Sequence, residues 1–348
     1  MASGIRRGAS PIVRRALSEA AAGSGLYRLA GSLYGGLGVI LMLHRVVEAG
    51  RPILEPGYEI NADVLDGILT KTRSMGWRAV TLDEMHRRLR GNETQGRVVC
   101  FTLDDGYLDN LQVALPVFRK HQAPLCTYVS TGLVERSVFY WWGALADLVS
   151  RNDRVEWVGS GGDGPRLFQA TTWREKQVAY ATLSGLCYDA DPALVTELLR
   201  RHGIDSQEAM ARDVLTQAQV RVLAADPLVT IGAHCVSHQR LLGMSDADAA
   251  REIEESRRVL EGWTGKELRH MAYPFGGPSA CGPREFDLAK RAGFATAVTT
   301  RRGNIFPEHG HHLTCLPRRM VPLDVVELRN VLFGVETVLR RWPRLRTV

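Results

Sequence analysis

The stretch with the clearest potential for chemistry is VVCFTLDDG, residues 98–106. Six mostly apolar residues, suited to a buried strand, run directly into Asp104, Asp105 and Gly106. Burying two adjacent carboxylates is costly unless another group compensates their charge. This arrangement therefore predicts a compensating positive charge, most simply a metal ion, at the end of the strand.

A second polar group follows another apolar run. In GAHCVSHQRL, His234 and His238 stand four residues apart and come directly after LVTIGA. One helical turn would place both imidazoles on the same side, and zinc requires neutral ring nitrogens about 2.0–2.1 Å away. Two surface histidines reach this spacing by chance as well, so the position after a strand is what favours metal binding.

The third group is MAYPFGG, residues 271–277, again after an apolar run. Pro274 and Gly276 predict a tight turn that can present backbone N–H groups. Alone it would indicate an ordinary strand-to-helix turn. Together, the three groups fall at the carboxyl ends of core strands, which is the edge where α/β proteins build their sites.

The residue types indicate hydrolysis. Two histidines and one aspartate leave coordination positions open for water and substrate, as in catalytic zinc sites. A bound ion lowers the pKa of its water towards about 7, and a second carboxylate can take the proton. Zn²⁺ suits this set best, although Co²⁺, Ni²⁺ or Fe²⁺ would also be accommodated.

The elements that must position these groups form an α/β pattern. Ser245 can cap a helix whose inner face carries Ala249, Ile253, Ser256 and Leu260. Helix-like segments of this kind separate several short apolar runs, which predicts a mainly parallel sheet. The runs lie at 39–43, 98–103, 124–129, 228–233, 269–273 and 295–299.

One long segment departs from this alternation. Residues 135–226 contain YWWGALADLV, a Gly-rich turn at 159–165 and amphipathic segments, which predicts a mainly helical insertion. We expect a basic N-terminal extension at 1–38, a catalytic domain at 39–325 and a basic C-terminal tail at 326–348.

Composition and charge limit the possible partners and the compartment. The apolar fraction of 45% and charged fraction of 24% are those of an ordinary soluble protein. The net charge of +6 gathers at the ends, since residues 1–45 hold six arginines and one acid and the last nine hold four arginines. This pattern indicates solvated arms or contact with anionic lipid, rather than nucleic-acid binding.

The compartment follows from the cysteines and the N-terminus. The six cysteines are scattered without a CxxC pair, and the N-terminus has no continuous apolar core before a cleavage site. We therefore expect a reduced, cytoplasmic protein, with the inner face of the membrane as an open alternative.

The three motifs together resemble the polysaccharide deacetylases of the NodB type, carbohydrate esterase family 4. TLDDG (102–106) is similar to the family's TFDDG, and HCVSH (234–238) to its H-S/T-x-x-H motif, with Cys235 in the Ser/Thr position. YPFG (273–276) is similar to the third motif. The resemblance implies an α/β fold, a distorted (β/α) barrel with fewer than eight strands, and metal-dependent removal of N-acetyl groups from a sugar.

The resemblance also implies residue roles. Asp105, His234 and His238 would bind the metal, Asp104 would be the catalytic base, and the backbone N–H of Phe275 would help to hold the oxyanion. We further expect substrate contacts from Tyr273, Pro274, Gly276, Tyr107 and Trp142. Trp142 and its neighbour Trp141 could stack on a sugar, but paired aromatic residues more often pack a core.

The chain departs from the family pattern in one catalytic position. Many members have an arginine two residues before the motif-three proline, where it pairs with the catalytic aspartate, but this chain has Ala272. Arg318 or Arg319, in LPRRMV, is the hypothetical replacement.

The general acid is not identified by any motif. His44 ends the first predicted strand and is as compatible with a structural role as with the site, and His311 and His312 are typical of a loop. Asp109 and Asn110 favour capping of the next helix over contact with the site.

These observations predict a metal-dependent deacetylase of an N-acetylated amino sugar, in a chitooligosaccharide-like chain or a glycan precursor. A close alternative is a deformylase or deacetylase of a lipid-linked amino sugar, since the same site would serve a formamide. A glycan-binding protein without turnover is the third reading, which the intact base and metal ligands disfavour.

Overall fold

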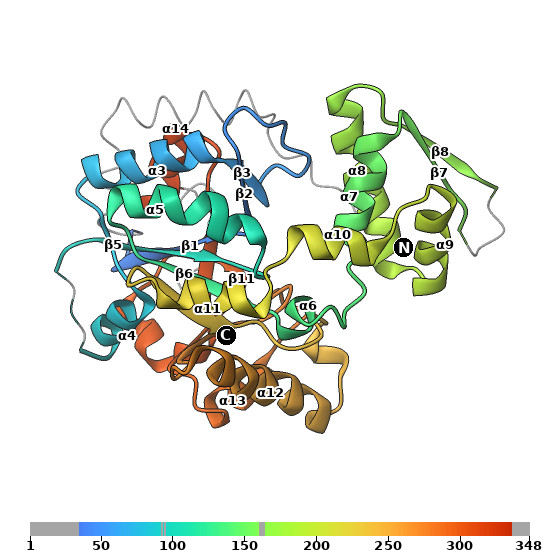
Figure 1. Ribbon diagram of the computed structural model, residues 1–348. Coiled ribbons are helices and arrows are strands. Elements are labelled where there is room, and N and C mark those ends of the chain that lie inside the picture. Colours follow the sequence, from blue (N-terminus) through green and yellow to red (C-terminus); the bar gives the residue numbers. More distant parts are fainter. Residues whose placement is uncertain (1–34, 92, 94, 160–163, 336–348) are drawn as a thin grey trace, which may run out of the picture.

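The computed structural model describes residues 35–91, 93, 95–159 and 164–335 (Figure 1). Its centre is a closed barrel of seven parallel strands, since β1 pairs with both β12 and β5, and β4 (Arg78–Ala79) extends the sheet beyond β5. The predicted barrel with fewer than eight strands is confirmed. In order around the barrel the strands are β1 (Gly38–Leu43), β12 (Leu316–Met320), β11 (Thr296–Arg302), β10 (His270–Ala272), β9 (Val229–Ala233), β6 (Leu125–Val129) and β5 (Val98–Leu103).

Each of the six predicted runs lies on a barrel strand, and every residue of β1 and β5 is buried. The seventh strand, β12, was missed because its sequence, LPRRM, contains a proline and two arginines instead of an apolar run. Both arginines of β12 are nevertheless buried.

Helices cover the barrel from outside (Figure 1). The predicted helix after Ser245 is confirmed as α12 (Asp246–Thr264): the Ser245 hydroxyl accepts a hydrogen bond from Asp248 N at 3.2 Å, and all four predicted face residues are buried. The other helices of this part of the chain are α3 (Ala62–Ser74), α4 (Leu82–Gly91), α5 (Leu115–His121), α6 (Thr131–Val134), α11 (Gln217–Ala225), α13 (Pro283–Arg291) and α14 (Val325–Leu332).

Short elements complete the loops at the ends of the strands. They are β2 (Arg45–Val47) and β3 (Glu59–Asn61), which pair with each other, and the single turns η1 (Asn110–Ala114), η2 (Leu241–Gly243), η3 (Pro307–His311) and η4 (Leu313–Cys315). The loop between β2 and β3 comprises residues 48–58.

The insertion forms a separate lobe beside the barrel, on the right of Figure 1. It consists of α7 (Trp141–Arg151), the antiparallel pair β7 (Arg154–Trp157) and β8 (Arg166–Gln169), α8 (Trp173–Asp189), α9 (Pro192–Arg201) and α10 (Ser206–Asp213). The lobe is mostly helical but also contains the antiparallel strands β7 and β8. It also ends earlier than the predicted 226, because α11 packs against β9 and α12 of the barrel.

The C-terminal boundary also differs from the prediction. Helix α14 lies within the expected tail, yet it packs against α3, and Leu328 and Leu332 are fully buried. The packed domain therefore reaches at least Val335, not 325. Residues 1–34 and 336–348, which hold most of the predicted basic ends, lie outside the described residues.

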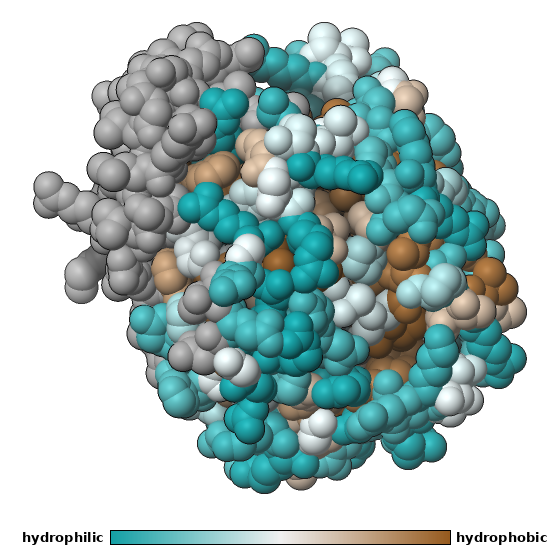
Figure 2. All heavy atoms as spheres, turned by 90° about the vertical axis from the view of Figure 1, so that its left-hand side faces the viewer, coloured by the Kyte–Doolittle hydropathy of each residue, from teal (hydrophilic) through white to brown (hydrophobic). Residues whose placement is uncertain are grey.

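The face in Figure 2 is largely polar, and the cysteine thiols lie in the core. The face shown in Figure 2 is mostly hydrophilic, with hydrophobic residues exposed in smaller patches. All six cysteines are buried and free. Within the described part of the chain, no helix combines the length and hydropathy needed to span a bilayer.

Candidate active site

The polar groups singled out in the sequence meet at the carboxyl ends of the barrel strands. Asp104 and Asp105 follow β5, His234 follows β9, His44 follows β1, and Arg318 lies within β12. Because all these strands are parallel, their carboxyl ends open on the same side of the barrel. Segments far apart in the sequence are thereby brought to one site.

Asp105, His234 and His238 bring three potential ligand atoms together. The Nε2 atoms of His234 and His238 lie 3.3 and 3.1 Å from Asp105 Oδ1, and one ligand atom from each residue lies within 4.8 Å of the others. His234 Nδ1 is 2.8 Å from the Ala272 carbonyl, so Nδ1 carries the proton and the Nε2 lone pair is available.

The two histidines act strongly on the charge of the buried Asp105. Burial would raise the pKa of Asp105, but His238 and His234 hold it well below its usual range. Its Oδ1 atom is buried, and no described donor meets it in hydrogen-bond geometry. A buried carboxylate oxygen without a donor, facing two imidazole nitrogens, fits a divalent ion.

Four non-glycine residues around the site have left-handed backbone conformations. They are Asp105 (φ +75°), Cys235 (+58°), His238 (+55°) and Phe275 (+61°). This conformation costs on the order of 1–3 kcal/mol for such residues and is found mostly at functional sites. The surrounding structure therefore holds the ligand-bearing turns in shapes that their own sequences disfavour.

Asp104 is held by Arg318, as hypothesised. Arg318 donates from Nη1 to Asp104 Oδ1 and from Nη2 to Oδ2, both at 2.7 Å, and both side chains are buried. Burial would raise the pKa of Asp104, but the Arg318 guanidinium lowers it below its usual value. Arg318 thus fills the role left open by Ala272, whereas Arg319 donates to Asn304.

His44 lies at the edge of this pair. Its Nε2 atom is 3.9 Å from Asp104 Oδ2, and its ring is tilted against that of Tyr58 with the ring centres 4.6 Å apart. Its buried Nδ1 has no hydrogen-bond partner among the described residues. Burial lowers the pKa of His44, while Asp104 and Asp105 oppose this. The imidazole therefore faces the site instead of being satisfied in the core.

The prediction that Asp109 and Asn110 cap the next helix is wrong. Asp109 accepts hydrogen bonds from Arg45 Nε at 2.8 Å and Val46 N at 3.2 Å, and Asn110 donates to the His44 carbonyl at 2.9 Å. These two residues instead fix the chain that follows β1, and with it His44.

The third motif shapes a turn. The Gly276 N–H donates to the Pro274 carbonyl at 2.7 Å around the left-handed Phe275. A Cβ on Gly276 would lie 2.6 Å from Thr300 N, so only glycine fits. The Phe275 side chain lines the cavity, and its backbone N–H has no hydrogen-bond partner among the described residues.

The predicted substrate contacts of Tyr273, Pro274 and Gly276 are not supported. All three are buried and none lines the cavity. The Tyr273 hydroxyl instead donates to the Thr314 carbonyl at 2.8 Å. These residues hold the turn, because a tyrosine this deeply buried needs an internal partner for its hydroxyl.

A cavity of about 650 Å³ opens above the ligand triad and is closed on one side by the insertion. Trp142 and Tyr107 line it, as predicted, and the Trp142 indole N–H donates to the Tyr107 hydroxyl at 2.9 Å. The Trp142 ring also lies 5.2 Å from the His238 ring. The cavity therefore combines aromatic walls with a few polar groups, as ligand-binding pockets commonly do.

The sequence comparisons agree with this geometry. The family profile described as polysaccharide deacetylase matches residues 91–297, which is more than half of the chain. The chain belongs to the polysaccharide deacetylase family. It is therefore a deacetylase, and the profile covers all three motifs. No curated protein sequence matches it.

Solved structures share the fold of this deacetylase. Deacetylase PplD of Streptococcus pyogenes, solved in complex with acetate, is 20% identical with a TM-score of 0.55, covering 83% of this chain and 95% of that one. IcaB from Ammonifex degensii is 19% identical with a TM-score of 0.55, covering 86% and 98%. The polysaccharide deacetylase BC0361 from Bacillus cereus is 15% identical with a TM-score of 0.52, covering 85% and 68%.

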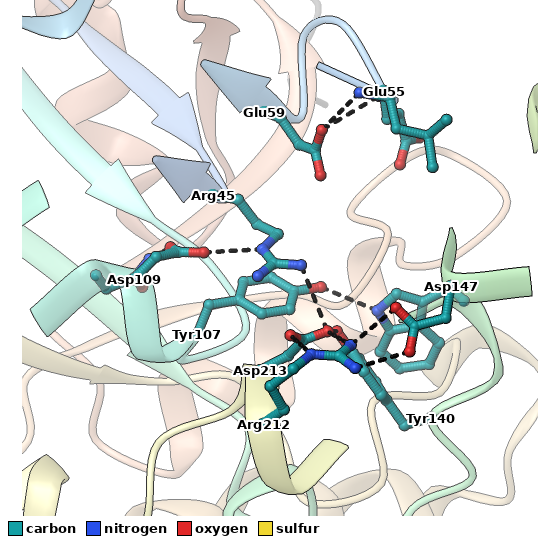
Figure 3. Close-up of polar contacts among 12 residues, drawn as sticks. Arg45, Glu55, Glu59, Tyr107, Asp109, Tyr140, Asp147, Arg212 and Asp213 are labelled. Atoms are coloured by element: carbon teal, nitrogen blue, oxygen red, sulfur yellow. Dashed lines mark hydrogen bonds and ion pairs between the residues drawn. The ribbon is translucent and has the colours of Figure 1, made fainter. Parts of the chain in front are cut away.

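Sequence reasoning missed a polar network that ties the insertion of this deacetylase to its barrel (Figure 3). Arg45 lies between Asp109 and Asp213, with its guanidinium over the Tyr107 ring at 4.9 Å. Asp213 also accepts from the Tyr140 hydroxyl at 3.3 Å. Arg45 directly follows His44, but no local pattern pairs it with a residue 168 positions away.

Proposed function

We propose that this deacetylase is a metal-dependent enzyme that removes N-acetyl groups from amino sugars within a glycan. The observation that carries the proposal is the pairing of two adjacent aspartates with different partners. Asp105 faces two histidines, and Asp104 is locked by Arg318. One aspartate is thus suited to a metal and its neighbour to proton transfer.

Asp105, His234 and His238 would hold the ion, with Zn²⁺ the best match to two imidazoles and a carboxylate. When bound there, the ion supplies a Lewis acid that activates water and polarises the acetamide carbonyl.

The remaining steps belong to the chain's own residues. Asp104 takes a proton from the attacking water, whose oxygen bonds to the acetamide carbon. Arg318 supports this role because its two hydrogen bonds keep Asp104 ionised and fixed in orientation. The free N–H of Phe275 is suited to stabilise the oxyanion that develops on the carbonyl oxygen.

The carbon–nitrogen bond then breaks, and the leaving nitrogen must gain a proton. His44 is the candidate for passing to that nitrogen the proton that Asp104 took from the water, since its ring lines the cavity and lies beside Asp104. The products are acetate and a free amine on the sugar. This assignment gives the departing nitrogen a proton source that no sequence motif identified.

The decisive experiment compares Asp104→Asn with the wild type. We expect the variant to keep its metal content, measured by elemental analysis, while acetate release from N-acetylglucosamine oligomers falls about 10²–10⁴-fold. His234→Ala is the complementary variant and should lose bound metal. Loss of metal from the Asp104→Asn variant would reverse the roles of the two aspartates.

The same assay separates the alternative functions. Formate release from an N-formylated lipid-linked sugar, without acetate from any N-acetylated glycan, would make the protein a deformylase. Glycan binding without release of either acid by the metal-loaded protein would make it a binding protein.

A further inference from the structure

Part of the cavity wall comes from the loop between β2 and β3, residues 48–58. The insertion holds this loop at one point: Trp173 Nε1 and Gln177 Nε2, both on α8, donate to the Ile53 carbonyl at 2.7 and 2.8 Å. Two side-chain donors on one carbonyl fix the loop as it enters the cavity wall. The residues that follow, from Leu54 to Glu59, all line the cavity.

Two carboxylates stand on this wall, and they differ in their surroundings. Glu59 Oε2 accepts from the backbone N–H groups of Leu54 and Glu55, at 2.9 and 3.4 Å, so it holds the shape of the loop (Figure 3). Glu55 lines the cavity, and no Lys, Arg or His of the described residues forms an ion pair with it. Asp104, on the cavity floor, has its guanidinium partner.

The free protein therefore holds Glu55 in an unfavourable setting. Burial and the nearby Glu59 charge raise the pKa of Glu55 to about 7, Asp105 adds to this effect, and only the Tyr180 hydroxyl favours the charged form. A carboxylate that is poorly solvated and lacks a cation gains most from a ligand that brings a positive charge.

The side chains around Glu55 suit a small organic cation. Tyr58 and Tyr180 also line the cavity, and aromatic rings attract ammonium groups. The buried Ser184 hydroxyl, on α8, also lines the cavity and has no hydrogen-bond partner among the described residues, which leaves a polar group for a ligand. A second metal ion does not fit, because the only group of three metal-binding side chains in the described residues is the triad already assigned.

We propose that Glu55 is a specificity residue that binds an ammonium group of the substrate, so that the enzyme prefers partly deacetylated amino-sugar chains. The amine belongs to a sugar other than the one being hydrolysed, and it reaches Glu55 while the acetamide occupies the triad. The proposal rests on the proposed deacetylase function and narrows its substrate class. It also implies that each deacetylation creates a better substrate for the next.

The test compares two substrates in wild type and in Glu55→Gln. One is a fully acetylated N-acetylglucosamine tetramer, and the other is the same tetramer with one free amine, placed at each unit in turn. We expect the wild type to favour an amine-bearing tetramer in kcat/KM, and Glu55→Gln to reduce that preference by about tenfold or more, the usual effect of losing a charge-assisted hydrogen bond.

Glu48→Gln is the matched control, because it removes the same charge from the same loop at an exposed position outside the cavity. It should keep the wild-type preference. A wild type without preference, or a Glu55→Gln variant that loses rate equally on both substrates, would overturn the proposal. Absence of acetate from both tetramers with metal-loaded wild type would instead contradict the deacetylase function itself.

A binding measurement separates recognition from turnover. We expect a fully deacetylated glucosamine oligomer to inhibit the wild type, and to do so less well as the pH falls below about 7, where Glu55 becomes protonated. The other titratable or charged side chains that face this region are His44, Tyr58, Glu59, Asp105, Tyr180 and Arg302. The assignment therefore depends on the variant: Glu55→Gln should lose this dependence. Its persistence in Glu55→Gln would assign it to another group and contradict the proposal.

Discussion

The pair formed by Arg318 and Asp104 places two opposite charges out of water with ideal bidentate geometry. Such a pair adds little net stability, because desolvation offsets most of the attraction. Removing one partner is different, since the other is left charged and buried. The pair is therefore better understood as fixing the orientation of Asp104, the proposed catalytic base.

Arg318→Met tests this interpretation. We expect the free energy of unfolding to fall by about 3–5 kcal/mol, because Asp104 keeps its burial and loses its counter-charge. The double variant Asp104→Asn with Arg318→Met should lose less than Arg318→Met alone. Chemical denaturation of the set measures the coupling, and additive losses would mean that the two side chains act independently.

The raised pKa of Glu55 should make the stability of the folded protein depend on pH. Its pKa is about 7 in the folded protein against 4.5 as the ordinary value, so wild-type stability is favoured below about 4.5 and declines as the pH rises through about 7. Glu55→Gln cannot ionise and should be more stable than wild type at pH 8 by about 1–2 kcal/mol, allowing for solvent screening, but equal at pH 4. Denaturation at both pH values measures this, and an equal difference at each would contradict the raised pKa.

The insertion and the β2–β3 loop are joined by hydrogen bonds, and both line the cavity. Trp173 and Gln177 act on a single carbonyl, 120 and 124 residues away in the sequence. The loop therefore depends on the insertion for its position.

The variants Trp173→Phe and Gln177→Ala test this dependence. Each alone leaves the Ile53 carbonyl one donor, whereas together they leave it none, at a cost of about 1–3 kcal/mol. We expect amide hydrogen exchange across residues 50–58 to accelerate mainly in the double variant, with a rise in KM larger than any fall in kcat. Exchange as slow as in the wild type would show that the loop is held by other contacts.

The sequence predicted the elements with strong local patterns and missed those that depend on distant partners. The apolar runs of β1 and β5 and the capped helix α12 can be recognised from their own sequences alone. LPRRM does not, because its arginines become strand residues only when Asp104 and Asn304 accept their hydrogen bonds. Likewise, the motifs predicted that Asp105, His234 and His238 would lie together, but only the fold shows that Tyr273 faces the core.

The packed domain as a whole includes α14, which follows the last barrel strand, β12, in the chain. The side chains of Leu328, Leu332 and Phe333 are buried, and the Phe333 ring lies 5.9 Å from that of Trp77. The sequence does not indicate this packing, because α14 is followed by a stretch rich in arginine, which predicts a basic tail.

Leu332→Ala tests whether α14 belongs to the cooperative core. We expect a loss of about 2–5 kcal/mol in the free energy of unfolding, as for other fully buried leucines. Leu167→Ala, at a leucine that is 55% exposed, is the control and should change stability by less than about 0.5 kcal/mol. Equal effects in denaturant unfolding would mean that α14 detaches before the barrel unfolds.

The left-handed residues around the triad have a consequence for engineering. Glycine adopts this conformation without the steric penalty borne by Asp105, Cys235, His238 and Phe275. Laboratory evolution that selects for heat resistance without an activity assay would therefore enrich glycine at these four positions, which lie in and around the proposed active site. Mutant libraries of this enzyme should keep those four codons fixed.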